Sequence, residues 1–193
     1  MMNRNYSNDK KKVVGPKEEY AYVLDVVSVG GSFSSNEVVQ AIGETSFTLF
    51  ELIPRPGVNV RSGQRVYIGD GKRDEIQYIK RILFMDKLSS DAASELPFII
   101  ADIVKGKEEY FVKFFNTAGA MSIRRHALEI IPGIGKKYLK DLLEVRDEKP
   151  FESFVDIKTR CPFLSDPVKA ISERIVAEME GETDIKFFVR RQQ

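Results

Sequence analysis

A short run of glycines and lysines in the C-terminal half has the residue types and spacing of an anion-binding turn. It follows Pro132 and lies between two apolar periodicities that predict helices over residues 122–131 and 136–146. The glycines permit a tight reversal and a close backbone approach, and the amides that open the second predicted helix favour a phosphate. The candidate binding residues are Gly133, Ile134, Gly135, Lys136, Lys137 and Lys140.

The charge around this turn leaves two alternatives open. Arg124 and Arg125 lie on the first predicted helix and are further candidate phosphate contacts. However, a Pro-Gly-Ile-Gly turn can simply join two helices, and paired lysines usually lie on a solvated face. Residues 121–193 carry nearly balanced basic and acidic side chains, so the overall charge does not decide between binding and plain structure.

The turn and its flanking periodicities resemble the helix-hairpin-helix motif over residues 123–146. The resemblance implies that the hairpin amides grip a sugar-phosphate backbone without reading its sequence. The residues that follow fit a paired motif, because Ser153 and Asp166 are typical helix caps and Gly181 is a typical helix end. The second hairpin, at residues 161–166, lacks the Gly-x-Gly and places an acid where a phosphate would lie. We interpret it as a packing partner of the first hairpin.

The N-terminal half contains a second set of candidate nucleic-acid contacts, on and between predicted strands. Runs of β-branched and aromatic residues predict strands over residues 20–29, 37–42, 47–53, 65–68 and 75–85, with a turn at residues 30–32, and such short strands suggest a small barrel. Basic residues alternate with tyrosines here, which suits a groove for single-stranded nucleic acid, while ordinary barrel surface explains them equally well. The candidate contacts are Arg61, Arg65, Tyr67 and Tyr78.

Helical patterns connect the two halves. Ser89 or Ser90 predicts a helix start, and Pro97 favours the first turn of its continuation through Lys105, with another helix over residues 108–116. The alternation of apolar and basic residues over 184–191 predicts a strand that returns to the barrel in preference to an ordered tail.

The predicted fold class is multidomain α+β, with a small OB-like or SH3-like β-barrel followed by an all-α helix-hairpin-helix pair. The segments are a flexible basic arm (1–18), the barrel (19–87), a helical connector (88–120), the paired motif (121–181) and a C-terminal strand or tail (182–193). This order resembles an archaeal family of uncharacterised proteins that join an OB-like barrel to such a pair. The resemblance implies RNA or DNA binding around ribosomal RNA maturation or translation, with ribosomal or RNA-processing proteins as partners.

Composition bears on whether the chain could be an enzyme, a metal-binding protein or a membrane protein. The 193 residues include a single histidine and a single cysteine, and the formal net charge is +1. His126 is expected to be exposed, Cys161 to be a buried, unreactive thiol, and the acids from Glu178 to Asp184 to be solvated. We therefore expect no metal, no cofactor and no catalytic residue. No segment approaches the ~20 apolar residues of a membrane span, which is typical of a soluble cytoplasmic protein without a membrane partner.

The sequence therefore predicts a non-catalytic nucleic-acid-binding protein that contacts the phosphate backbone, with RNA favoured slightly over DNA. A protein-interaction adaptor, in which the helical pair is purely structural, is the alternative. A hydrolase with carboxylates gathered from distant strands is a third hypothesis.

Overall fold

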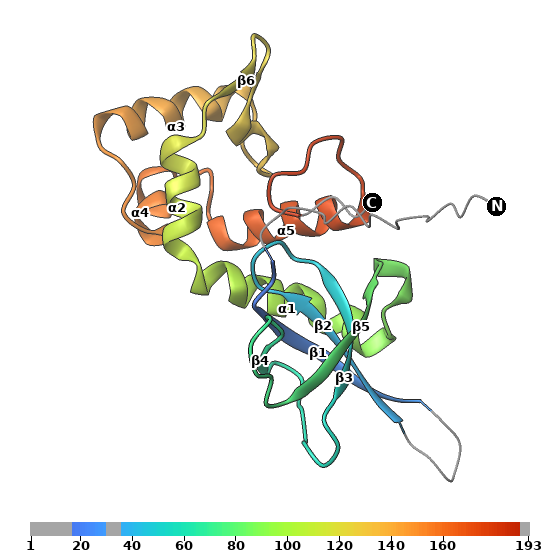
Figure 1. Cartoon of the computed structure of the whole chain (residues 1–193). Coiled ribbons are helices and arrows are strands. Elements are labelled where there is room, and N and C mark those ends of the chain that lie inside the picture. The colour runs from blue at the N-terminus through green and yellow to red at the C-terminus, as the bar shows by residue number, and fades with distance from the viewer. Residues whose placement is uncertain (1–16, 30–35, 190–193) are drawn as a thin grey trace, which may run out of the picture.

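A curled antiparallel sheet forms the N-terminal half of the computed structural model, which describes residues 17–29 and 36–189 (Figure 1). The strand order is β4-β1-β2-β3-β5, so each predicted strand of this half is confirmed. β-branched and aromatic residues are frequent in these strands because they fit a pleated, largely buried surface. The strands are β1 (Tyr20–Val29), β2 (Asn36–Gly43), β3 (Leu49–Pro54), β4 (Arg65–Tyr67) and β5 (Ile76–Leu83).

Both faces of the sheet are apolar, and alternation along each strand separates them. Val23 and Ala41 belong to a small cluster on one face, whereas Leu24 and Ile42, one residue further along, belong to the cluster shared with the helices. A helical layer must therefore cover the second face.

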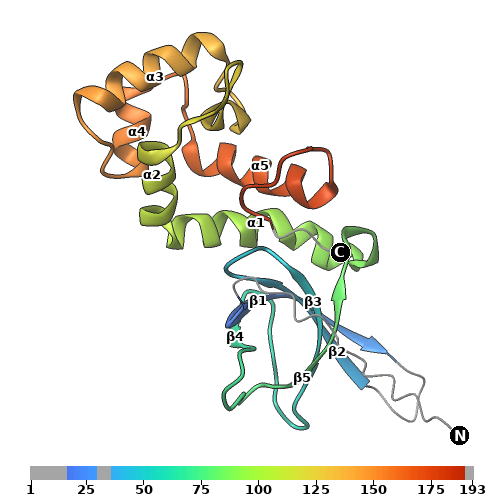
Figure 2. The same cartoon turned by 45° about the horizontal axis from the view of Figure 1, so that its top comes forward.

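α1 provides that cover, and five α-helices build the helical layer (Figure 2). The hydroxyl of Ser89 accepts the amide of Ala92 and donates to Asp25 of β1, and the Ser89 amide donates to Gln40 of β2, so the start of α1 is fixed to the sheet. α5 packs on α1. The helices are α1 (Ser90–Gly106), α2 (Glu108–Thr117), α3 (Lys136–Glu148), α4 (Phe154–Arg160) and α5 (Pro167–Glu180), and the short 3-10 turn η1 (Met85–Lys87) precedes them.

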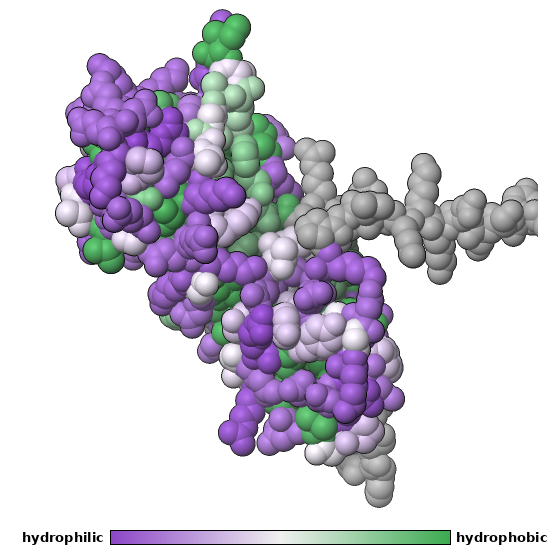
Figure 3. All heavy atoms as spheres, turned by 60° about the vertical axis from the view of Figure 1, so that its left-hand side comes forward, coloured by the Kyte–Doolittle hydropathy of each residue, from purple (hydrophilic) through white to green (hydrophobic). Residues whose placement is uncertain are grey.

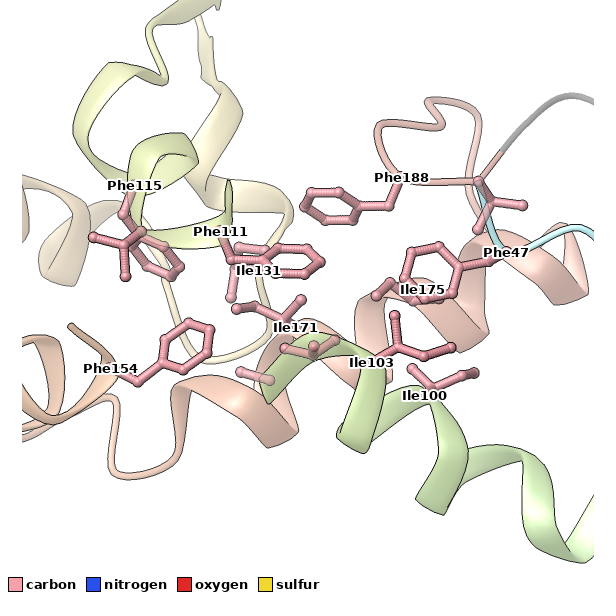
Figure 4. Close-up of a cluster of buried hydrophobic side chains, with 14 of the residues drawn as sticks. Phe47, Ile100, Ile103, Phe111, Phe115, Ile131, Phe154, Ile171, Ile175 and Phe188 are labelled. Atoms are coloured by element: carbon pink, nitrogen blue, oxygen red, sulfur yellow. The ribbon is translucent and has the colours of Figure 1, made fainter. Parts of the chain in front are cut away.

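One apolar cluster runs from the sheet through α1 to the last helices. Figure 4 shows Phe47 beside the sheet, Ile100 of α1, Ile175 of α5 and Phe188 near the C-terminus converging on it. A mixed α+β fold with an N-terminal sheet followed by helices is thereby confirmed, while the division into separate domains stays a prediction. None of the helices in the described ranges is long and apolar enough to cross a bilayer.

Several helix ends agree with the sequence, and one proline does not. Ser153 accepts the amide of Asp156, Asp166 accepts that of Lys169, and Gly181 ends α5 in the left-handed conformation, as predicted. The prediction for Pro97 is wrong, because this proline lies inside α1. It is tolerated on the exposed face of the helix, where water can hydrate the carbonyl that loses its amide partner.

The predicted helix over residues 122–131 is also wrong. The chain forms a small hairpin of β6 (Ala120–Ser122) and β7 (Arg125–His126), followed by the 3-10 turn η2 (Ala127–Ile130). His126 caps that turn through the Leu128 amide, while Glu129 accepts the His126 amide in return. These local hydrogen bonds compete with a helix that is too short to nucleate cheaply.

The C-terminal segment is a packed tail, so the predicted return strand is wrong within the described residues up to 189. Phe188 and Val189 are buried, and the Glu178 carboxylate accepts the amides of Phe187, Phe188 and Val189. Glu178 is fully buried and pairs with Arg174 at 2.9 Å, which corrects its interpretation as solvated charge.

The prediction that the flexible N-terminal arm extends to Glu18 is wrong, because Glu18 is held by the turn between β2 and β3. The Glu18 carboxylate accepts the amides of Thr45 and Ser46 and is nearly buried. The predicted turn at residues 30–32 and the arm over residues 1–16 lie outside the described residues.

Candidate nucleic-acid interface

Two buried isoleucines fix the glycine-containing turn before α3. Ile131 and Ile134 are buried, as expected for an anchored turn. Gly133 has a φ of +90°, which L-amino acids with side chains adopt only with strain, so this position requires glycine. Gly135 is the cap residue of α3 with an ordinary φ of −86°, and a Cβ placed there would meet nothing within 4 Å. Its lack of a side chain therefore leaves the helix end open to solvent.

The amides of this turn are only partly available to a ligand. The Ile134 amide donates to the Ile131 carbonyl at 3.1 Å, so its predicted role as a phosphate donor is wrong. The amides of Gly133 and Gly135 have no acceptor among the described residues. α3 has no side-chain cap and no acid in its first turn, whereas α1 and α5 are capped by Ser89 and Asp166. The partial positive charge of this helix end is therefore not compensated.

The predicted lysines surround this helix end. Lys136 and Lys137 are exposed and form no ion pair within the described part of the chain. Lys140 lies 3.7 Å from Glu144, but both side chains are well exposed, so the pair contributes little and either partner can exchange it for another. A phosphate approaching α3 would meet this positive charge before any acid of the same helix turn.

The second predicted hairpin, at residues 161–166, packs against one side of the glycine-containing turn before α3. Phe163 stacks on Tyr138 of α3, with ring centroids 4.5 Å apart and planes within 9° of parallel. Leu164 contacts the position where Gly133 would carry a side chain. Asp166 caps α5 and lines a small pocket of about 250 Å³ beside Gly133, together with Glu173 and Lys169. The lysine lies 3.8 Å from Glu173, so the two acids leave this pocket poorly suited to a phosphate.

The two predicted arginines lie beside the turn on a different element. Arg124 and Arg125 are exposed in the β6–β7 hairpin, and the helix expected to carry them does not form. This hairpin was not predicted from the sequence. The spacing of His126 and Glu129 is nevertheless that of a capping box, which indicates that a new helical turn starts after His126.

Two of the four barrel candidates, Arg65 and Tyr67, meet at the ring of Tyr20, and the other two lie on different elements. Arg65 of β4 pairs with Glu44 at 2.6 Å, which raises the pKa of its guanidinium, and lies 3.4 Å over the ring of Tyr20. Tyr67 contacts the same ring and its hydroxyl accepts the Gly71 amide. Tyr78 is 48% exposed on β5, the edge strand opposite β4 in the strand order, and Arg61 lies in an exposed loop between β3 and β4.

The other basic residues of the barrel are largely paired. Lys80 and Arg81 both contact the Glu51 carboxylate, at 2.6 and 2.7 Å. Burial raises the pKa of Glu51, but these hydrogen bonds and charges outweigh burial and leave the pKa below its usual value. The barrel surface therefore offers less free charge than the end of α3.

The single cysteine of the chain is buried, and the single histidine caps a turn. The Cys161 thiol is buried as predicted, and burial raises its pKa. His126 is partly buried, not exposed as predicted, because its Nδ1 accepts the Leu128 amide. The described residues contain no group of three side chains that could hold a metal ion.

We expect His126 to titrate below the usual histidine pKa of ~6.5. Burial and the charge of Arg146 lower its pKa, against the opposing effect of Glu129. Its stabilising contribution is thus complete above the unfolded pKa and is lost as the pH falls through the folded pKa, because protonation removes the acceptor of the Leu128 amide. The chain has a single histidine, so its ring proton resonances in an NMR titration report this pKa directly. A midpoint at or above that of the urea-unfolded chain would contradict the assignment.

These features define an α+β protein in which a curled five-stranded sheet supports a layer of five helices. The chain belongs to the family described as a protein of unknown function, DUF655, which matches residues 17–190. It is 40% identical over 173 residues to the uncharacterized protein MJ0038 of Methanocaldococcus jannaschii, covering 89% of this chain and 79% of that relative. The crystal structure of Af1531 from Archaeoglobus fulgidus is similar, with 39% identity and a TM-score of 0.82, over 90% of this chain and all of that one. The expected resemblance to an uncharacterised archaeal family is thereby confirmed.

Proposed function

We propose that this protein is a non-catalytic nucleic-acid-binding protein that grips the sugar-phosphate backbone at the N-terminal end of α3. The open end of α3 carries the proposal, because it combines unpaired amides, an uncompensated helix dipole and three exposed lysines. This is the arrangement expected of a helix-hairpin-helix contact, with η2 in place of most of the first helix. We also propose that the curled sheet is an OB-like barrel.

The salt dependence of binding provides a direct test. Three lysines and two arginines allow about three to five phosphate contacts, which predicts a slope of about −2 to −4.5 for log affinity against log salt. Fluorescence anisotropy with a labelled single-stranded or duplex RNA, at several salt concentrations, measures this slope. A slope near zero, or no binding at low salt, would contradict the proposal.

RNA remains slightly favoured over DNA, and the matched DNA oligonucleotide in the same titration decides this point. Amides and lysines that contact phosphates do not sense the 2′-hydroxyl, so we expect the two affinities to lie within about tenfold. Incubation of either substrate with magnesium or manganese is expected to leave it intact, whereas cleavage would favour a hydrolase.

An adaptor that binds another protein is the second candidate, and one surface favours it. A groove of about 740 Å³ lies between α1 and α5, lined by the exposed Phe98 and by Val168 and Val176. Apolar side chains at a groove between helices are typical of protein contacts. Stable co-purification with a protein, which Phe98→Ser abolishes, together with no retention of nucleic acid, would support this function instead.

A further inference from the structure

The β6–β7 hairpin carries an apolar side chain at a protruding tip. Ile123, between the two strands, is fully exposed and is the most exposed large apolar residue in the described chain. Figure 3 shows an apolar tip that stands clear of the hydrophilic surface of the helices. A single exposed apolar residue is ordinary on a flat surface, but here it lies at the outermost point of an element that can enter a partner.

The hairpin is also basic and firmly held. Arg124 and Arg125 follow the tip, and residues 121–128 contain no acid. The Ser122 hydroxyl accepts the Arg124 amide within the turn, and Arg146 of α3 donates to the carbonyl of Ala118 at the base. In both ribbon views the hairpin lies next to the N-terminal end of α3, which begins at Lys136 (Figures 1 and 2). One nucleic acid could therefore contact both elements.

We propose that this hairpin is a wedge for double-helical nucleic acid with an interrupted stack. Ile123 packs against the open face of a base pair at a bulge, while Arg124 and Arg125 contact the flanking phosphates. The wedge rests on the proposed function and deepens it, because it assigns the class of nucleic acid. Apolar side chains flanked by arginines are the residues that proteins insert between base steps.

The size of the side chain explains why an interrupted stack is required. Burying one isoleucine is worth about 10- to 100-fold in affinity. Opening a stacked base step costs a comparable factor, so an intact duplex would gain almost nothing from the wedge. At a bulge the step is already open, and the gain is retained.

An anionic lipid surface is the competing partner for an apolar, basic tip. A single isoleucine supplies far less apolar contact than even one acyl chain, which anchors proteins only marginally. The exposed lysines of α3 add further positive charge that phosphates of a polynucleotide can contact. These observations favour nucleic acid.

The test compares two RNA duplexes that differ only in a single-nucleotide bulge, with 2-aminopurine next to the bulge. We expect the wild type to bind the bulged duplex about tenfold more tightly and to change the 2-aminopurine fluorescence on binding. Ile123→Ser is expected to lose both effects and to keep its affinity for the intact duplex within about twofold. Val155→Ser is the matched control, because Val155 is also well exposed but lies on α4.

Each other outcome overturns the wedge. If the wild type binds both duplexes equally, or if Ile123→Ser weakens both equally, the wedge is refuted while backbone binding through α3 stands. If the wild type binds neither duplex but binds single-stranded RNA, only the wedge is refuted, and if it binds none of these RNAs the proposed function fails as well. If Ile123→Ser affects only binding to phosphatidylserine vesicles, the tip is a membrane contact.

Discussion

Gly135→Val combined with Lys136→Glu is expected to lower the affinity for RNA by at least about 100-fold while the protein stays folded. Valine at the cap position places a branched side chain over the free amides of the first turn of α3. Glutamate at the first helical position repels a phosphate that the lysine attracts. The two changes therefore act on the same few ångströms of the interface, through shape and through charge.

The folded state tolerates this double substitution because its effects on stability oppose each other. A Cβ on Gly135 meets no atom within 4 Å, and the backbone there is accessible to any residue. Valine is a poorer cap than glycine by roughly 1 kcal/mol or less. Glutamate in the first turn recovers ~0.3–1 kcal/mol from the helix dipole. We therefore expect the free energy of unfolding, from urea titration, to change by less than about 1 kcal/mol.

One control variant tests general charge effects, and a second variant tests the stability of the turn itself. Lys158→Glu makes the same change in net charge on the exposed surface of α4 and is expected to alter the affinity by less than about threefold. Gly133→Ala forces a side chain into a φ of +90° and is expected to cost ~1–2 kcal/mol of stability. Undiminished RNA binding by the folded double variant would remove α3 from the interface.

The second large effect is on stability, and it comes from Glu178. We expect Glu178→Ala to lower the free energy of unfolding by ~3–5 kcal/mol, because it leaves Arg174 and three tail amides without their acceptor. Thermal and urea denaturation measure the loss, and hydrogen exchange at Phe187, Phe188 and Val189 localises it.

Glu180→Ala is the matched control for this prediction. Glu180 lies two residues further along α5 and is exposed, so its loss is expected to change stability by about 0.5 kcal/mol or less. Equal effects of the two substitutions would show that the buried carboxylate does not hold the tail.

Features with a local cause could be predicted from the sequence. The five strands of the sheet follow from β-branched runs, and the starts at Ser89, Ser153 and Asp166 follow from side chains that accept amides two or three residues away. The anchored turn with Gly133 and Ile134 was predictable for the same reason, since its shape depends on the residues within it.

Features that depend on distant partners could not be predicted. One error has a local cause instead: the apolar spacing from Ile123 to Ile131 suits a helix, but the nearby capping pair of His126 and Glu129 favours a 3-10 turn that starts at Ala127. Glu178 resembles any surface acid until the tail folds back onto it. The pairing of Arg65 with Glu44 joins β4 to the turn after β2, so the sequence could not show that this arginine is engaged.

The continuous apolar cluster affects how the chain folds during its synthesis. Its members range from Leu24 in β1 to Val189, and the last of them close over Glu178. During synthesis the sheet emerges early but cannot cover the face that α1, α5 and the tail occupy until nearly the whole chain is available. A nascent chain halted before residue 187 would thus expose an apolar surface to solvent. We expect such a chain to aggregate unless a chaperone binds it.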